Sequence, residues 1–181
     1  AQDFPLVQTA QLQAEAFRLA AGADIGLVSI GGYHDGYENY SGVCGKLFAG
    51  DVSLDVINAI VPGLYKDPLC ILTLSGAEIK GLLETGFVTA QGVQGFPYVP
   101  SGLSLVRNAD GSIRQLSLDD GSILDEASIY TVAVDSGGFA EELGRRGSVR
   151  QTELAVVDVV REYMSAHTPL YPLAPWENER I

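Results

Sequence analysis

The stretch that most constrains the fold is a short apolar strand that runs directly into two glycines. The continuous apolar run over 25–28 is typical of a strand buried in a sheet. Gly31 and Gly32 follow it, and paired glycines at the end of a strand allow the backbone to approach another group closely. We therefore expect a buried strand over 25–29 with something bound against its carboxyl end.

The side chains around these glycines offer groups that bind small molecules. Ser29 carries a hydroxyl, Tyr33 an aromatic ring, and His34 an imidazole whose charge changes near neutral pH. A tight turn with solvated side chains is the alternative interpretation of a glycine pair taken alone. The neighbouring sequence favours a site.

Length and charge narrow the class of protein. The 181 residues, 46% of them hydrophobic, suit a single domain over 1–181. Eleven basic and twenty-three acidic residues give a net charge of −12, which argues against nucleic acid or an anionic membrane surface as partner. No apolar run reaches the roughly 18 residues that a membrane span needs. A small nucleotide is still allowed, because an acidic surface can hold a local anion site.

Helix and strand signals alternate in the first half of the chain. Apolar spacing predicts a helix over 6–21 that Gly22 ends. A second helix over 54–61 begins after Asp51 or Ser53, and a strand follows over 69–74. Ser75 and Glu78 then have the spacing of a capping box, which predicts a third helix after this strand.

Strand signals dominate the second half. Turn sequences at 108–111 and 119–121 separate predicted strands over 103–107, 113–118 and 129–134. Ser148 and Gln151 have capping-box spacing, so we expect the last helix to begin there. This order predicts an α/β (α+β) sandwich, a mixed sheet with flanking helices.

These segments together resemble the C-terminal domain of the 5'-nucleotidase family. The family has an Ala-Asp-Ile-Ala-Leu strand running into Asn-x-Gly-Gly-Ile-Arg, and here residues 23–34 keep both glycines but carry Ser29 for the Asn and His34 for the Arg. The strand Tyr-Thr-Val-Ala at 130–133 and the closing Arg-Ile at 180–181 are also similar to the family's motifs. The resemblance covers nearly the whole chain.

The resemblance implies a nucleoside- or nucleotide-like ligand between the Gly31-Gly32 turn and the loop over 95–102. Family members hold the nucleobase between two aromatic rings. Pro100 aligns nearest to the first ring, with Phe96 and Tyr98 close by, and Phe139 is the nearest similar residue to the second, several positions early. The predicted substrate-binding residues are Ser29, Gly31, Gly32, His34, Phe96, Tyr98 and Phe139. No catalytic residue and no metal ligand is expected among them.

The resemblance also implies where the chemistry lies. In the family, an N-terminal metallophosphoesterase domain uses two metal ions to activate water. None of its Asp-x-His, Gly-Asn-His-Asp or Gly-His-x-His motifs occurs here, so we expect no phosphohydrolase activity and no cofactor from this chain alone. Divalent metals are expected only in a catalytic domain, a possible partner. The family context implies a secreted, periplasmic or cell-surface location, and the start at Ala1 fits either a mature N-terminus or a cut in a longer chain.

Two alternatives stay open from the sequence. The chain is either the substrate-specificity domain of a 5'-nucleotidase-like hydrolase, or a non-catalytic binding or protein-interaction module that keeps the fold and has lost the nucleotide site. Cys44 and Cys70 form either one disulfide or two unpaired thiols.

Overall fold

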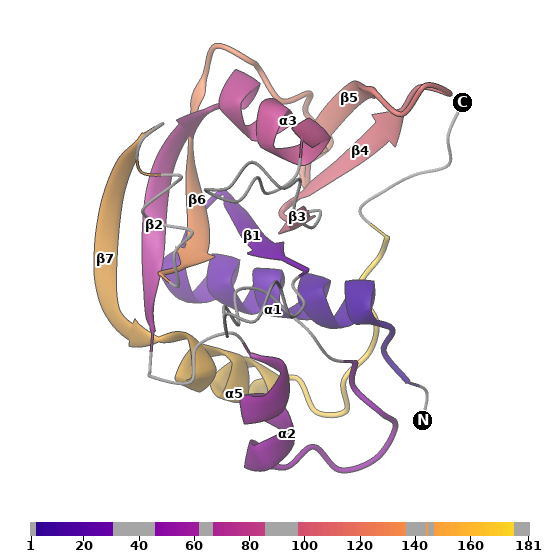
Figure 1. The fold of residues 1–181 in the computed structure, drawn as a ribbon, viewed down its shortest axis with the longest axis vertical. Helices are drawn as coiled ribbons and strands as arrows, with labels where there is room; N and C mark the ends of the chain where they lie inside the picture. Colours follow the sequence, from indigo (N-terminus) through magenta and orange to yellow (C-terminus); the bar gives the residue numbers. More distant parts are fainter. Residues whose placement is uncertain are drawn as a thin grey trace, which may run out of the picture.

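The computed structural model describes residues 3–30, 46–61, 67–85, 98–136, 144 and 147–175. A five-stranded mixed sheet has the order β3-β1-β6-β2-β7, and a two-stranded hairpin pairs β4 with β5 (Figure 1). The strands are β1 (Ile25–Ser29), β2 (Pro68–Ser75), β3 (Tyr98–Ser101), β4 (Leu103–Arg107), β5 (Ile113–Leu118), β6 (Ile129–Asp135) and β7 (Ser148–Ala155). The helices are α1 (Leu6–Ala21), α2 (Leu54–Ile60), α3 (Gly76–Thr85) and α5 (Val156–Ala166).

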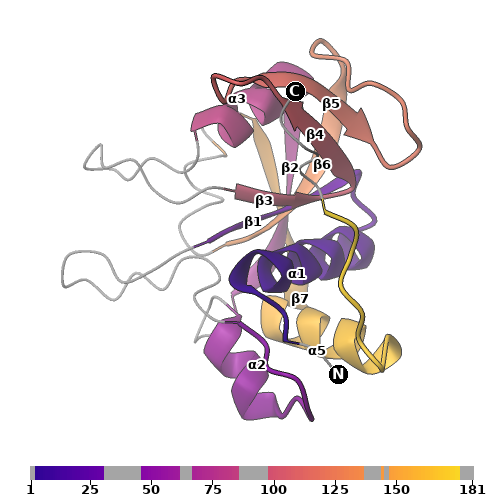
Figure 2. The ribbon, with the colours of Figure 1, turned by 90° about the vertical axis from the view of Figure 1, so that its right-hand side faces the viewer.

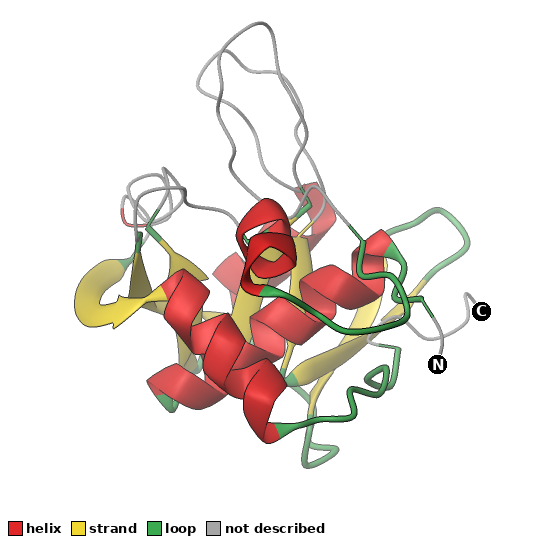
Figure 3. Ribbon diagram, turned by 90° about the horizontal axis from the view of Figure 1, so that it is seen from below, coloured by secondary structure: helices red, strands yellow, loops and turns green. Residues whose placement is uncertain are grey.

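The elements form layers, and the predicted mixed sheet with flanking helices is confirmed. Helix α1 lies directly under the sheet, and α2 and α5 lie beneath α1 (Figure 2). Helix α3 and the β4-β5 hairpin cover the opposite face. Seen from below, helices lie in front of the strands (Figure 3). No helix of the described residues is long and apolar enough to cross a membrane.

Helix α1 has the predicted bounds and is buried on more sides than one. Gly22 ends it in the left-handed conformation, with φ of 60° and its N–H bonded to the Leu19 carbonyl at 3.2 Å. Leu12, Ala16 and Phe17 are all at most 1% exposed. Helix α1 is buried on several sides because it lies between the sheet and α5. A single apolar stripe predicts burial of one side of the helix only.

Close contact between α1 and β1 requires a glycine at position 26. A Cβ atom built on Gly26 would lie 1.9 Å from the Ala14 carbonyl oxygen, far inside van der Waals contact. The missing side chain therefore lets the helix backbone lie directly on the strand. This contact sets the distance between α1 and the end of β1.

Strand β2 passes into α3 through the predicted capping box. The Ser75 N–H donates to Glu78 Oε2 at 2.7 Å, and the Glu78 N–H donates to Ser75 Oγ at 3.3 Å. The predicted hairpin is also confirmed, since the Gly111 N–H closes its turn on the Asn108 carbonyl at 2.9 Å. Ser53 rather than Asp51 caps α2, accepting from the Val56 N–H at 3.4 Å.

Two local predictions were wrong. Ser148 does not cap the last helix: residues 148–155 form β7, an edge strand on β2, and α5 begins only at Val156 without a side-chain cap. Residues 98–101 were predicted as part of a loop and form β3, antiparallel to β1. In both cases pairing with a distant strand overrides the local sequence signal.

Candidate ligand site at the edge of the sheet

Ser29 and Tyr98 come together where β1 ends, and Asp135 ends the neighbouring strand β6. Strands β1 and β6 are parallel neighbours, so their last residues, Ser29 and Asp135, lie at the same end of the strands. We call this end, where the carboxyl ends of β1 and β6 meet, the edge. The antiparallel strand β3 lies beside β1 (Figure 2) and begins at this edge. Tyr98 is directly opposite Ser29, so the two side chains lie on the same face of the sheet.

The Ser29 hydroxyl is buried without a hydrogen bond. The residue is 3% exposed, and its Oγ atom has no partner in the part of the chain that the structure describes. A buried hydroxyl that leaves water and finds no partner costs about 1–3 kcal/mol. Such a group is tolerated where a ligand or an ordered water completes its hydrogen bonds.

Asp135 is the last residue of β6, and the register of β6 with β1 sets it level with Val28, on the sheet face opposite to Ser29. The residue is 3% exposed and lies opposite Leu69 of β2. Burial raises the pKa of the neighbouring Cys70 thiol, and the charges of Asp135 and Asp67 raise it further.

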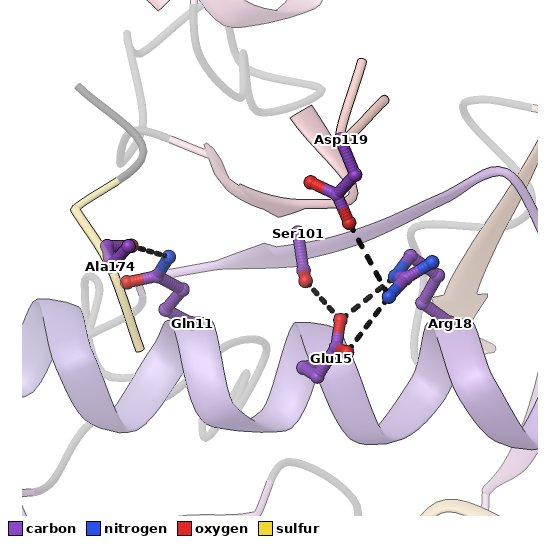
Figure 4. Close-up of polar contacts among 6 residues, drawn as sticks. All are labelled: Gln11, Glu15, Arg18, Ser101, Asp119 and Ala174. Atoms are coloured by element: carbon purple, nitrogen blue, oxygen red, sulfur yellow. Dashed lines mark hydrogen bonds and ion pairs between the residues drawn. The ribbon is translucent and has the colours of Figure 1, made fainter. Parts of the chain in front are cut away.

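A polar network holds β3, and hence Tyr98, against α1. Arg18 Nε and Nη2 donate to the two carboxylate oxygens of Glu15, each at 2.8 Å, and Ser101 of β3 donates to Glu15 Oε2 (Figure 4). Arg18 Nη2 also lies 3.5 Å from Asp119 Oδ2, which ties in the turn after β5. This bidentate geometry fixes orientation as well as distance.

The network stabilises the charged form of Glu15. Burial alone raises the pKa of this carboxyl, but the hydrogen bonds from Arg18 and Ser101 and the charge of Arg18 outweigh it, so the pKa is lowered. The hydrogen bond to Glu15 raises the pKa of Arg18 in turn. A second link joins β1 to β6, because Asp24 Oδ2 accepts from the Thr131 N–H at 2.8 Å and from its hydroxyl at 2.7 Å.

The structure places two of the seven predicted site residues and brings them together. Ser29 and Tyr98 are paired across β1 and β3. Tyr98 is 3% exposed, so its ring packs within the edge. The other five, Gly31, Gly32, His34, Phe96 and Phe139, lie outside the described residues.

Sequence reasoning missed Asp135 and the network around Glu15. Asp135 stands first in the motif Asp135-Ser-Gly-Gly-Phe139, and a carboxylate at the end of a predicted strand was an available signal. Glu15 and Ser101 carried no such signal, because they are 86 positions apart and meet only in the fold.

Metal ligation and disulfide formation are two further kinds of chemistry that the side chains of this domain could support. Within the described ranges, no group of three or more His, Cys, Asp or Glu side chains is arranged to hold a metal ion. Cys70 is a buried free thiol, which favours the unpaired alternative, and Cys44 lies outside the described residues.

Comparison with known families identifies the fold family of this chain. The model of the family described as the C-terminal domain of 5'-nucleotidase matches residues 3–144, which is more than half of the chain. Among curated protein sequences, none matches.

Solved structures share the fold at low sequence identity. A 5'-nucleotidase precursor from Thermus thermophilus aligns over 98% of this chain and 36% of its own, with a TM-score of 0.68 and 17% identity. The NAD nucleotidase of Haemophilus influenzae aligns over 88% of this chain and 30% of its own, with a TM-score of 0.64 and 16% identity. A putative 5'-nucleotidase from Staphylococcus aureus aligns over 87% and 33%, with a TM-score of 0.59 and 15% identity. The chain thus spans about a third of the length of each of these proteins.

Proposed function

The chain belongs to the family of 5'-nucleotidase C-terminal domains, and from this premise we propose that it is the substrate-binding domain of a nucleotidase-like phosphohydrolase. In this proposal it binds the nucleoside part of the substrate at the edge formed by Ser29 and Tyr98. A metallophosphoesterase domain outside this chain supplies the divalent metals and the hydrolytic step. The extracytoplasmic location expected of such a hydrolase belongs to the same proposal, and cell fractionation tests it.

One observation carries the proposal: the buried Ser29 hydroxyl has no hydrogen-bond partner in the described part of the chain. It lies at the carboxyl end of a parallel strand pair, which is where ligands commonly bind in α/β sheets. A ligand hydroxyl or amine that meets Ser29 recovers the hydrogen bond that the free protein lacks.

The substitutions in the family's motif indicate which part of the ligand this edge binds. Ser29 and His34 stand where the resembling family has Asn and Arg. A hydroxyl and an imidazole lack the permanent charge and the bidentate geometry with which Arg binds a phosphate, so a ribose and base fit this edge better than a phosphate does.

Titration of the isotope-labelled chain with adenosine and with AMP, followed by NMR, tests the proposal. We expect the amide signals of Ser29 and Tyr98 to shift with both ligands, and adenosine to bind at least as tightly as AMP. Ser29→Ala removes one ligand hydrogen bond and weakens adenosine binding by about threefold to tenfold. Ser148→Ala is the matched control, because Ser148 is exposed on β7 and pairs with Thr73, away from this edge.

Two results would contradict the proposal. The first is the absence of binding at millimolar concentration, or shifts that leave 29 and 98 unchanged, either of which assigns the chain to the non-catalytic interaction modules instead. The second is phosphate release from AMP by the purified chain with Mg²⁺, Mn²⁺ or Zn²⁺, which would place the chemistry in this domain.

A further inference from the structure

A groove lies on the helical side of the molecule, away from the edge of the sheet where β1 ends. Its volume is about 970 Å³, the upper end of the range for small-molecule sites. Residues 47–54, the C-terminal half of α5 and the segment 168–172 form its walls, and Phe4 and Met164 lie in its buried floor. Helices α2 and α5 stand next to each other here (Figure 2).

Exposed aromatic rings gather in this groove. Among the described residues, Phe48 is 65% exposed and Tyr171 is 74% exposed, whereas every other described Phe or Tyr is buried or half-buried. Both exposed rings line the groove, and the half-exposed Leu54 lies between the same walls. Exposed rings that face one hollow offer stacking surfaces for a flat apolar group.

Two positively charged side chains lie near these rings, although the chain as a whole has a net charge of −12. The Lys46 ammonium lies 4.7 Å from the centre of the Phe48 ring, and Arg161 lines the groove with its side chain 46% exposed. Arg161 Nη2 contacts Asp158 Oδ1 at 2.9 Å, but a guanidinium has five N–H donors and this contact uses one nitrogen. Asp51 also lines the groove, and its carboxylate disfavours a ligand with more than one negative charge.

We propose that this groove is a second ligand site, for a planar aromatic molecule with a single negative charge. The ring stacks on Phe48 and Tyr171, and the anionic group accepts hydrogen bonds from Arg161. The proposal is independent of the nucleoside site, because no groove residue belongs to the edge around Ser29.

Three probes separate the ring from the charge: 2-naphthoate, its neutral analogue 2-naphthamide, and cyclohexanecarboxylate. We expect 2-naphthoate to shift amide signals within 46–54 and 161–171 and to leave Ser29 unchanged. It should bind more tightly than either of the other two, about fivefold or more, because each of them lacks one of the two contacts.

Variants of exposed residues test the two contacts without disturbing the core. Phe48→Ala should weaken 2-naphthoate about fivefold or more, and Arg161→Gln should remove its advantage over 2-naphthamide. Ile123→Ala is the matched control, since Ile123 is 68% exposed and lies outside the groove.

The proposal is overturned if 2-naphthoate gives no shifts in the groove at millimolar concentration, or if it binds Phe48→Ala and Arg161→Gln as tightly as the unmodified chain. Equal binding of 2-naphthoate and 2-naphthamide also overturns it, because the charge would then play no part. An adenosine titration of the same samples distinguishes the two proposals. If the nucleoside site is wrong, the Ser29 signal stays unchanged with adenosine, whereas if the groove site is wrong, the groove signals stay unchanged with 2-naphthoate.

Discussion

Ser29→Ala should make the ligand-free protein more stable. The hydroxyl of this residue is 3% exposed and has no hydrogen-bond partner in the described structure, so it contributes an unfavourable term of about 1–3 kcal/mol. Alanine has nearly the same volume and no polar atom, so the substitution should raise the free energy of unfolding by about 1 kcal/mol or more. In a chain of this size, 1 kcal/mol corresponds to about 2–4 °C in Tm.

Ser101→Ala is the matched control, on the strand that pairs with β1. Ser101 is 6% exposed, and its hydroxyl donates to the charged Glu15, an interaction that contributes about 1.5–3 kcal/mol. Calorimetry without ligand should therefore show a higher Tm for Ser29→Ala and a lower one for Ser101→Ala. With saturating adenosine, the gain in Tm should be larger for the unmodified chain than for Ser29→Ala. If Ser29→Ala lowers the Tm as much as Ser101→Ala does, Ser29 has a partner in the free protein and the reasoning is refuted.

Further predictions concern packing, acid stability and capping. In urea unfolding, Gly26→Ala should destabilise the domain by about 3 kcal/mol or more, because the new Cβ meets the Ala14 carbonyl. Gly81→Ala, in open space on α3, should instead stabilise it by about 0.5–1 kcal/mol, and similar effects of the two variants would contradict the packing argument. Because folding lowers the pKa of Glu15, this carboxylate stabilises the folded protein above its usual pKa of 4.5, and that stability is lost as the pH falls through the folded-state pKa. Glu15→Gln should therefore reduce the loss of unfolding free energy below about pH 4.5. An unchanged slope of stability against pH would contradict this explanation. Ser75→Ala removes the cap of α3 and should lower the free energy of unfolding by about 1 kcal/mol, with no loss in urea unfolding counting against the capping box.

The part of the fold that was predictable rests on contacts between residues close in sequence. The end of α1 at Gly22 depends on one turn of helix, and the capping box of Ser75 and Glu78 spans three positions. The hairpin turn at 108–111 is equally local. Propensity and spacing report such contacts directly, so these elements have the predicted positions.

The candidate site was predictable only in part, for a physical reason. Ser29 was identified because glycines follow its strand, and Tyr98 because of a family resemblance. That the two residues face each other depends on the register of β1 against β3, which was predicted as a loop. Asp135 ends at the same edge only because β6 runs parallel to β1.

The sequence by itself determined the family, the order of most helices and strands, and the acidic charge that argues against nucleic acid as partner. Only the tertiary structure decided that Ser148 lies in an edge strand and not at a helix cap, because pairing with β2 outweighs a local capping signal. It also decided that α1 is enclosed, that Ser101 meets Glu15 across 86 positions, and that Phe48 and Tyr171 face one groove. These arrangements come from contacts between residues far apart in the chain, and no local pattern of residues encodes them.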